Sequence, residues 1–559
     1  MKRIPLLLIA ALLLAAFLRL YRLDSLPVSL FGDEIDVGFQ SLSLWQTGKS
    51  YTGQFLPTYI SSVAESRAPL LMYVTAPFVG ILGTSNFVVR LAPALFGILG
   101  VLVLFYLVKV SFAKEKRAAL IAGLSSLFLA VSFWHLHYSR AAFESSLLLF
   151  LLILGFTGVI GYLSTGERKF AFLWPALALA FYTYSTATVF APLLLAITLF
   201  IYKDKIKLER KVLSPLLITL VLLIPIVFQI FGGHAGDRFK SISIFGDRTV
   251  TDAVELSRTQ PWVNPKLDRI FHNRPIELFT RFSQNYLASF SPNFLFTNGD
   301  SQLRHSVPGF GELPLVFAPL FLLGLYQIFR RSLRSDFFLL SWLFVAPVSS
   351  ALTIDGGNHA TRLILMVPPL VILAAIGAGS IWELFNRRLA LLVTLIWASC
   401  LAWQVTSYWY QYTGVYPSQS SRSWHYGYQD VMRYIPKYDT GSNRIFVNNT
   451  HEPSLLRLAF YGQIPPAQFQ KQFSGDKIVD QILPGFNGFK LGDRYYLGRA
   501  SSLESLQTLL APGDLYVAIQ GEEIPGDWNW NNNPPEGIVV LASTYDIWGQ
   551  PYMYLISRK

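Results

Sequence analysis

Long apolar runs recur along this chain, and many of them reach the length of about 18 residues or more that crosses a bilayer as a helix. Of the 559 residues, 52% are hydrophobic and 14% are charged, with a mean hydropathy of +0.40. A soluble chain carries charge on about a quarter of its residues. The sequence therefore predicts a polytopic, mainly helical integral membrane protein.

The formal net charge of +12 favours a membrane protein rather than a nucleic-acid-binding one. Lys and Arg accumulate in cytoplasmic loops because they resist translocation, and here they gather in short connections between apolar runs. We therefore expect no nucleic-acid partner. The single cysteine, Cys400, lies within an apolar run and excludes an intramolecular disulfide.

Five short basic connections set the predicted topology: 109–117, 166–169, 203–211, 330–334 and 386–388. The N-terminal segment has a basic start without a small-residue cleavage pattern, so we interpret it as an uncleaved helix with a cytoplasmic N-terminus. Placing the connections in the cytoplasm predicts eleven crossings and an outer C-terminus. The predicted helices are 4–20, 87–108, 118–134, 146–163, 170–183, 187–202, 212–231, 311–329, 337–352, 363–380 and 389–407.

The first outer loop, 24–86, is predicted to hold two helices that lie along the membrane. Segment 68–82 contains Pro77 and is too short to cross, and counting it as a crossing would move every basic connection outside. Segment 34–48 has an apolar face opposite a polar one. The apolar face holds Ile35, Phe39, Leu42 and Trp45, and the polar face holds Asp36, Gln40 and Ser43.

Composition divides the chain near residue 407. Residues 1–407 are predicted to form the membrane domain, with a long outer loop at 232–310 that can be translocated despite its charges. Residues 408–559 are predicted to form a small extracytoplasmic α/β domain. Its expected strands are 444–449, 515–520, 538–543 and 551–557, with a helix near 454–462.

Polar and ionisable residues gather at the predicted outer ends of the helices. Such groups are costly at membrane depth unless they pair or line a cavity, so they are candidates for a functional site. The candidates are Asp33, Glu34, Glu65, Arg67, His135, His137, Tyr138, Arg140, Tyr184, His359 and Arg362.

Several of these residues have a simpler structural interpretation. Asp33 can cap the helix that follows it, and Arg140 stands at helical ion-pair spacing from Glu144. Arg67 and Arg362 can extend toward lipid headgroups. The gathering of these polar residues at one face of the membrane, rather than any single residue, favours a functional site.

A metal ion is left open by the sequence. His135 and His137 are two residues apart and would diverge on a helix, so both could reach one ion only from an extended turn. No cofactor is required by the pattern. If a divalent metal takes part, Glu34, His135 and His137 are its candidate ligands.

Several motifs, taken in order, resemble the GT-C glycosyltransferases, above all family 39 with its protein O-mannosyltransferases and the related lipid A aminoarabinose transferases. Over roughly residues 15–380 they read "RLYRLDSLP", "GDE", "RAPLLMYV", "VVRLAPALFG", "HYSRAAFE" and "ATRLILMVPPL". Members transfer a sugar from a polyprenyl-phosphate donor to an acceptor on the outer side of the membrane. Where mannosyltransferases usually carry an "HPPL"-like string, this chain has "RAPL", which leaves the sugar and the acceptor open.

The resemblance implies that Asp33 is the catalytic carboxylate and Glu34 its companion. Asp36 lies on the polar side of the predicted helix, so we expect it to be merely solvated. The resemblance also implies that basic residues hold the donor phosphate. The candidates are Arg362, Arg140 and Arg67, with Glu65, His137, Tyr138, Tyr184 and His359 as further substrate contacts.

The chemistry needs a base for the acceptor hydroxyl and a cation for the departing phosphate. A single base opposite the leaving group predicts inversion. The acceptor is a protein, a lipid or a glycan.

Two other functions fit part of the pattern. An oligosaccharide transferase or ligase would use a diphosphate-linked lipid donor. A lipid or sugar transporter would place polar or broken helices at the bilayer midplane, with inverted repeats, whereas the charges here lie at the predicted helix ends.

Overall fold

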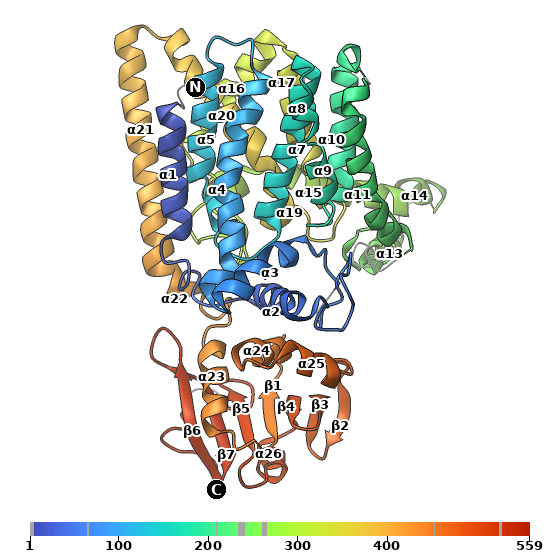
Figure 1. Ribbon diagram of the computed structural model, residues 1–559, viewed down its shortest axis with the longest axis vertical. Helices are drawn as coiled ribbons and strands as arrows, with labels where there is room; N and C mark the ends of the chain where they lie inside the picture. Colours follow the sequence, from blue (N-terminus) through green and yellow to red (C-terminus); the bar gives the residue numbers. More distant parts are fainter. Residues whose placement is uncertain are drawn as a thin grey trace. The chain divides into compact units, whose positions relative to one another are not determined.

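The computed structural model describes residues 5–63, 66–207, 209–232, 241–259, 265–441, 443–451, 453–524 and 528–559. It forms two compact units (Figure 1). The helical unit comprises Met1–Tyr21 and Pro93–Gly414, and the α/β unit comprises Arg22–Ala92 and Val415–Lys559. The predicted fold class, mainly helical with a C-terminal α/β part, is confirmed.

The longer helices of the first unit follow the predicted apolar runs. They are α1 (Leu6–Leu20), α4 (Asn86–Ser111), α5 (Ala118–Val131), α7 (Ser145–Thr165), α10 (Ala187–Ile201), α11 (Leu213–Gly232), α16 (Phe317–Arg331), α17 (Arg334–Val345), α20 (Val367–Leu384) and α21 (Arg387–Tyr410). Shorter helices are α6 (Phe133–Tyr138), α8 (Arg168–Ala171), α9 (Pro175–Ala180), α18 (Val348–Ala351) and α19 (Ala360–Leu363).

Among the residues that the structure describes, five helical segments are long and apolar enough to span a membrane: Asn86–Ser111, Ser145–Thr165, Arg210–Ile230, Ala360–Leu384 and Arg387–Ser420. The count of eleven crossings therefore stays a prediction. Two predicted helices, 170–183 and 337–352, are wrong as continuous elements, because the chain breaks before Pro175 and at Pro347. Proline lacks an N–H and disfavours helical geometry in the residue before it.

The core of the helical unit lies around α20, whose span is 94% buried. α16 and α20 approach so closely that a Cβ on Gly324 or Gly377 would collide with a carbonyl of the facing helix. By contrast, the spans of α11 and α21 are only 11% and 6% buried. Such apolar, outward-facing helices are typical of contact with lipid.

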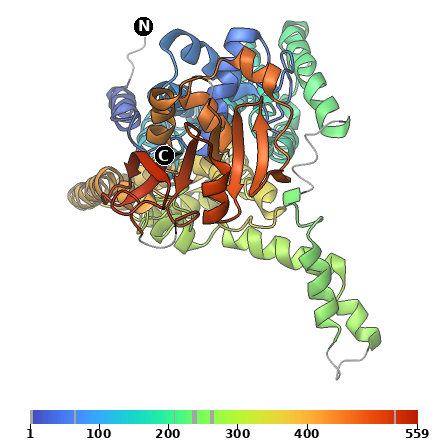
Figure 2. The same ribbon diagram turned by 90° about the horizontal axis from the view of Figure 1, so that it is seen from below.

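The described part of the long loop 232–310 includes α13 (Arg248–Ser257), α14 (Pro265–Phe271) and α15 (Arg274–Ala288), which project from the rest of the helical unit (Figure 2). Polar groups of α15 point back to the protein, since Arg281 pairs with Asp247 at 2.7 Å and Asn285 donates to the carbonyl of Thr353 at 2.8 Å. Phe279 and Leu287 are exposed.

The described residues of the α/β unit form a seven-stranded sheet in the order β2-β3-β4-β1-β5-β7-β6. β1 is parallel to β4 and β5, and the other pairs are antiparallel. The strands are β1 (Ile445–Asn448), β2 (Val479–Leu483), β3 (Phe486–Leu491), β4 (Tyr495–Ala500), β5 (Leu515–Ile519), β6 (Ile538–Tyr545) and β7 (Pro551–Arg558). The four predicted strands are β1, β5, β6 and β7.

The helices of this unit are α2 (Gly32–Thr47), α3 (Leu70–Leu82), α22 (Tyr416–Ser420), α23 (Tyr428–Tyr438), α24 (Ser454–Tyr461), α25 (Pro466–Gln472) and α26 (Leu503–Leu509). The helix predicted near 454–462 is therefore confirmed as α24.

The predicted polar face of α2 is not solvated. Asp36 is 2% exposed, and Gln40 and Ser43 are fully buried, because α2 packs against α3 on one side and α24 and α25 on others. The amide of Gln470 in α25 donates to Ser43 Oγ at 3.0 Å. The first outer loop, assigned by sequence to the membrane domain 1–407, lies in the same compact unit as residues 415–559.

Candidate functional site

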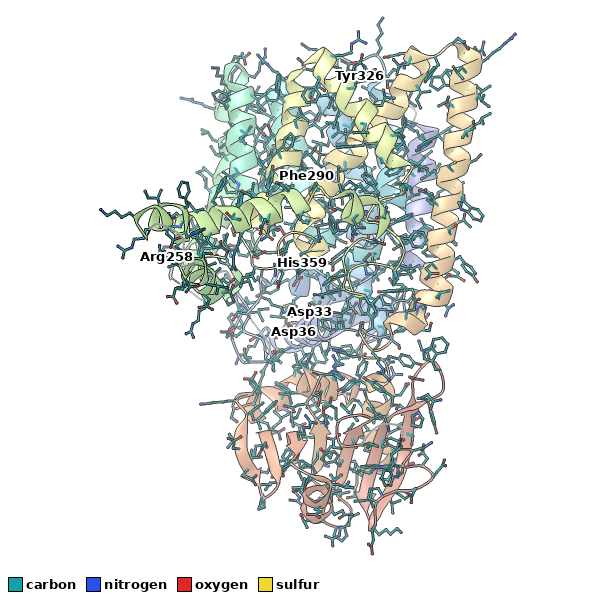
Figure 3. All side chains as sticks on the ribbon, turned by 180° about the vertical axis from the view of Figure 1, so that it is seen from behind. Asp33, Asp36, Arg258, Phe290, Tyr326 and His359 are labelled. Carbon is teal, nitrogen blue, oxygen red and sulfur yellow. The ribbon has the colours of Figure 1, made fainter. Side chains whose placement is uncertain are left out.

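The sequence Gly-Asp-Glu-Ile-Asp begins α2 and places three carboxylates on its first turns; Figure 3 labels two of them, Asp33 and Asp36. The backbone of Phe31 is extended, and its N–H donates to Glu34 Oε2 at 3.0 Å. Negative charge at a helix N-terminus is favoured by the helix dipole. We call Asp33, Glu34 and Asp36 the acidic turn.

Glu34 is fully buried and forms a two-pronged ion pair with Arg90 of α4, which is also fully buried. Its oxygens accept from Arg90 Nε at 2.8 Å and from a terminal nitrogen at 3.0 Å. Arg90 also donates to the carbonyls of Pro27 at 2.7 Å and Ser29 at 2.6 Å. Glu34 and Arg90 thus fix the chain that leads into α2.

Arg67 joins the two other carboxylates of the acidic turn. One terminal nitrogen donates to Asp33 Oδ1, and Nε lies 3.3 Å from Asp36 Oδ2. The side chain is 4% exposed. Its backbone pairs with Ile60 through N–H···O bonds of 2.8 and 2.9 Å, which hold the segment before α3 in place.

Asp36 was expected to be solvated, and that expectation is wrong. Burial raises the pKa of Asp36 to about 6, although the nearby Arg67 opposes this shift. The neighbouring Tyr51 is also buried, and its hydroxyl donates to Ser62 Oγ at 3.0 Å and accepts from the N–H of Val63 at 2.7 Å. The segment 51–63 therefore covers the side of α2 that sequence assigned to water.

Exposure separates the three acids. The Asp33 side chain is 35% exposed, whereas those of Glu34 and Asp36 are 0% and 2% exposed. Among these three, only Asp33 presents a carboxylate that an incoming molecule could contact.

A second group of candidates meets in the helical unit. The hydroxyl of Tyr138, in α6, lies 2.8 Å from His305 Nδ1 and 2.8 Å from Thr361 Oγ1. The ring of His305 lies 5.3 Å from that of His359, which Figure 3 labels at the start of α19. We call Tyr138, His305, His359 and Thr361 the Tyr138 cluster; sequence reasoning missed His305 and Thr361.

His137 stands next to this cluster. Its Nε2 lies 2.7 Å from the carbonyl of Arg304, which fixes that nitrogen as the donor. Burial lowers the pKa of His137 to about 4, so the ring is neutral at pH 7.

Two acidic residues that sequence reasoning did not single out hold the loop before α16. Asp300 Oδ2 accepts from the N–H of Ala360 at 3.0 Å, and the N–H of Asp300 donates to buried Glu312 at 3.1 Å. Burial raises the pKa of Asp300. Asp300 therefore ties this loop to the first residue of α19. The acid in "TNGDSQ" was visible in sequence, but its partners lie far along the chain.

The candidate arginines differ in their surroundings. Arg140 is fully buried and donates to the carbonyls of Leu18 at 2.6 Å and Tyr21 at 2.8 Å, and to Tyr412 Oη at 3.2 Å. Arg362, in α19, donates to Thr353 Oγ1 at 2.7 Å. Its Nε is buried and donates to no partner among the described residues.

The metal candidates have other partners. His135 Nδ1 lies 2.8 Å from a nitrogen of Arg19, and Glu34 is held by Arg90. Within the part of the chain that the structure describes, no three His, Cys, Asp or Glu side chains group to hold a metal ion. Tyr184 lies half-buried in the turn between α9 and α10, and Glu65 lies outside the described residues.

Comparison with known proteins supports a glycosyltransferase fold. Residues 66–228 match the family model described as dolichyl-phosphate-mannose-protein mannosyltransferase. Crystal structures of ArnT from Cupriavidus metallidurans, in the apo state and bound to undecaprenyl phosphate, are each 14% identical, with 98% of this chain and 97% of that chain covered and a TM-score of 0.53. No curated protein matches the chain.

The archaeal oligosaccharyltransferase AglB from Archaeoglobus fulgidus is 13% identical over 81% of this chain and 63% of its own, with a TM-score of 0.48, too low to bear on function. The ArnT comparison shows a shared fold along almost the whole chain. Together with the family match, it confirms the resemblance to GT-C glycosyltransferases predicted from sequence.

Proposed function

We propose that this chain, with its GT-C glycosyltransferase fold, transfers a sugar from a polyprenyl-phosphate-linked donor to an acceptor on the outer face of the plasma or inner membrane. The family match over residues 66–228 and the ArnT fold support the reaction class. One of the ArnT structures holds undecaprenyl phosphate, which supports a polyprenyl-phosphate donor. The N-terminus is proposed to be cytoplasmic.

The observation that carries the assignment is the unequal exposure of the acidic turn. Asp33 alone among its three carboxylates is open to a substrate. Arg67 at its side pairs with the carboxylate, which is the form that accepts a proton. We assign Asp33 as the base that deprotonates the acceptor hydroxyl.

Glu34 supports Asp33 without meeting the substrate. Its buried pair with Arg90 fixes the start of α2, and hence the direction of the Asp33 side chain. Asp36 acts in the same way through Arg67, because both carboxylates share that guanidinium. Glu34 and Asp36 therefore position Asp33 and do not contact the substrate themselves.

Arg362 is the proposed partner of the donor phosphate. Its forked guanidinium suits phosphate oxygens and stays charged at any relevant pH. One buried nitrogen of Arg362 has no hydrogen-bond partner among the described residues, whereas each nitrogen of the Arg140 guanidinium already donates within the helical unit. The other proposed substrate contacts are Glu65, Arg67, His137, Tyr138, Tyr184 and His359.

The reaction balances with one base and one leaving group. The acceptor oxygen forms a bond to the anomeric carbon as the bond from that carbon to the donor phosphate oxygen breaks. The acceptor proton passes to Asp33, and the phosphate leaves with the electron pair. A base opposite the leaving group gives inversion.

The test is Asp33→Asn, with transfer followed from a labelled polyprenyl-phosphate sugar in lipid. We expect transfer to fall by at least about a hundredfold, while expression and donor binding persist. Asp24→Asn is the matched control, since Asp24 is an exposed acid of the same outer loop. Transfer at the wild-type rate by Asp33→Asn would refute the assignment.

A donor screen with products identified by mass separates the alternatives. A monophosphate-linked monosaccharide supports the proposal, and a diphosphate-linked oligosaccharide supports a transferase or ligase of preassembled glycans. Movement of lipid across the bilayer without a new glycoside supports a transporter. A divalent metal stays a hypothesis, and its test is loss of transfer in a chelator with recovery on adding back one metal.

A further inference from the structure

A cavity of about 390 Å³ lies at one end of the helical unit. Its walls come from the turn 112–117 between α4 and α5, from the last turns of α16, and from the last turns of α20. Figure 3 labels Tyr326, the neighbour of the lining residue Gln327. The cavity is distinct from the Arg362 region, because its α20 residues, Ile376 to Glu383, lie 14 to 21 positions after Arg362, in the second half of that helix.

Positive charge exceeds negative charge around this cavity. Its cations are Lys114, Lys116, Arg117 and Arg331, and its acids are Glu115 and Glu383. Among the lining residues the excess is two positive charges, and Asp336, just outside the lining, offsets one of them at Arg331.

Both acids face arginines rather than lysines. Arg117 lies 3.2 Å from Glu383 and also donates to the carbonyl of Gly379 at 2.5 Å. Arg331 lies 3.8 Å from Glu115 and is held more closely by Asp336, at 3.0 Å. The arginines are therefore fixed walls of the cavity.

The lysines supply the unmatched charge. Lys114 and Lys116 are exposed at the cavity, and neither forms an ion pair with a described residue. A flexible ammonium on a four-carbon stem can reach an anion held within such a cavity. The charge and the space together favour an anionic ligand.

The surroundings point to the membrane surface as its source. The cavity lies where predicted crossing helices end, and the turns 109–117 and 330–334 are two of the five basic connections predicted to be cytoplasmic. Exposed apolar side chains stand on the same helix ends, with Phe329 at 68% and Leu120 at 43% exposure. A headgroup in the cavity would leave its acyl chains beside such residues.

We propose that this cavity binds the phosphate of an anionic membrane lipid. Basic pockets between membrane helices on the cytoplasmic side suit lipid headgroups, because each Lys or Arg near the surface attracts an anionic lipid. Arg117 and Arg331 shape the pocket, and Lys114 and Lys116 supply the attraction. The site does not depend on the glycosyltransferase assignment.

The test compares Lys114→Gln/Lys116→Gln with Lys203→Gln/Lys207→Gln, which removes the same charge from another predicted cytoplasmic turn. Purified full-length protein is titrated with phosphatidylglycerol or phosphatidylcholine, and bound lipid is counted by native mass spectrometry. We expect the wild type to prefer phosphatidylglycerol and the cavity variant to bind it about tenfold or more weakly. The control variant should bind like the wild type.

Three outcomes would overturn the proposal. The cavity variant could bind phosphatidylglycerol as well as the wild type does, or the control variant could lose as much. Inorganic phosphate could bind more tightly than phosphatidylglycerol, which would assign the cavity to a free anion. Repeating the titration on Asp33→Asn separates this site from the transfer reaction, since lipid binding should persist when transfer is lost.

Discussion

The acidic turn and the Tyr138 cluster hold their polar groups by different means. In the acidic turn, three acids within four residues form ion pairs with two arginines, Arg67 and Arg90, from separate segments. In the Tyr138 cluster, single polar residues from distant segments meet through hydrogen bonds. The first arrangement depends on ion pairing, and the second on the packing that brings the distant segments together.

The largest expected effect breaks the charge balance of the acidic turn. Arg90→Met leaves Glu34 buried without its cation, which costs about 3–5 kcal/mol of unfolding free energy. Thermal unfolding in detergent measures this loss. Adding Glu34→Gln should recover part of it, because the second change removes the unpaired charge; no recovery would show that Arg90 acts through other contacts.

A second prediction uses the buried Asp36. Its pKa is raised from 3.8 to about 6, so the folded protein holds a proton that the unfolded chain has lost between these values. The contribution of Asp36 to the free energy of unfolding is therefore full below about pH 4. It falls by about 3 kcal/mol as the pH rises to 6. Asp36→Asn should flatten that part of the stability profile, measured by unfolding from pH 4 to 7.

Asp33→Asn is the control variant for this pH dependence of stability. Because the Asp33 side chain is 35% exposed, its replacement should leave the slope between pH 4 and 6 in place. Equal flattening by both variants would mean that the two acids titrate as one group around Arg67.

A smaller loss is expected in the Tyr138 cluster. Tyr138→Phe removes the hydroxyl that lies between His305 and Thr361, at a cost of about 1–3 kcal/mol. Unfolding measurements beside Arg90→Met test this order. A loss as large as that of Arg90→Met would show that the cluster contributes as much to the free energy of unfolding as a buried ion pair does.

The smallest effect concerns Arg362 and Arg140, the two candidate arginines that lie in the helical unit. Arg362→Lys keeps the charge but loses the forked pair of donors. We expect the kcat/KM for the donor to fall about tenfold, with a higher KM and a lower kcat, because the same nitrogens bind the donor phosphate and stabilise it as it leaves. Arg140→Lys should leave the KM unchanged and lower the unfolding temperature, since Arg140 donates to carbonyls of its own unit. The reverse pattern would exchange the two assignments.

Sequence predicted the elements whose signal is local. The apolar runs of α4, α7, α11, α20 and α21 and the strands β1, β5, β6 and β7 stand where expected. The strands β2, β3 and β4 were not predicted from the sequence. Glycines weaken a strand signal, and Gly488 pairs with Gly498 across β3 and β4 where a Cβ would strike the facing backbone.

The roles within the acidic turn show the limit of sequence more sharply. Three adjacent carboxylates at the end of an apolar run were visible, and Asp33 followed from the family resemblance. The burial of Glu34 and Asp36 could not be read from the pattern, because it depends on Arg90, 56 positions away from Glu34, and on Arg67, 31 positions beyond Asp36.

The sequence by itself determined a membrane-spanning, mainly helical chain with an α/β part at its C-terminal end, because run length and hydropathy are local properties that water and lipid act on directly. Only the tertiary structure decided which acid stays open, which arginines are already committed to carbonyls or carboxylates, and where unmatched lysines line a cavity. Those outcomes depend on burial and pairing between distant segments, and burial alone separates Asp33 from the two acids beside it.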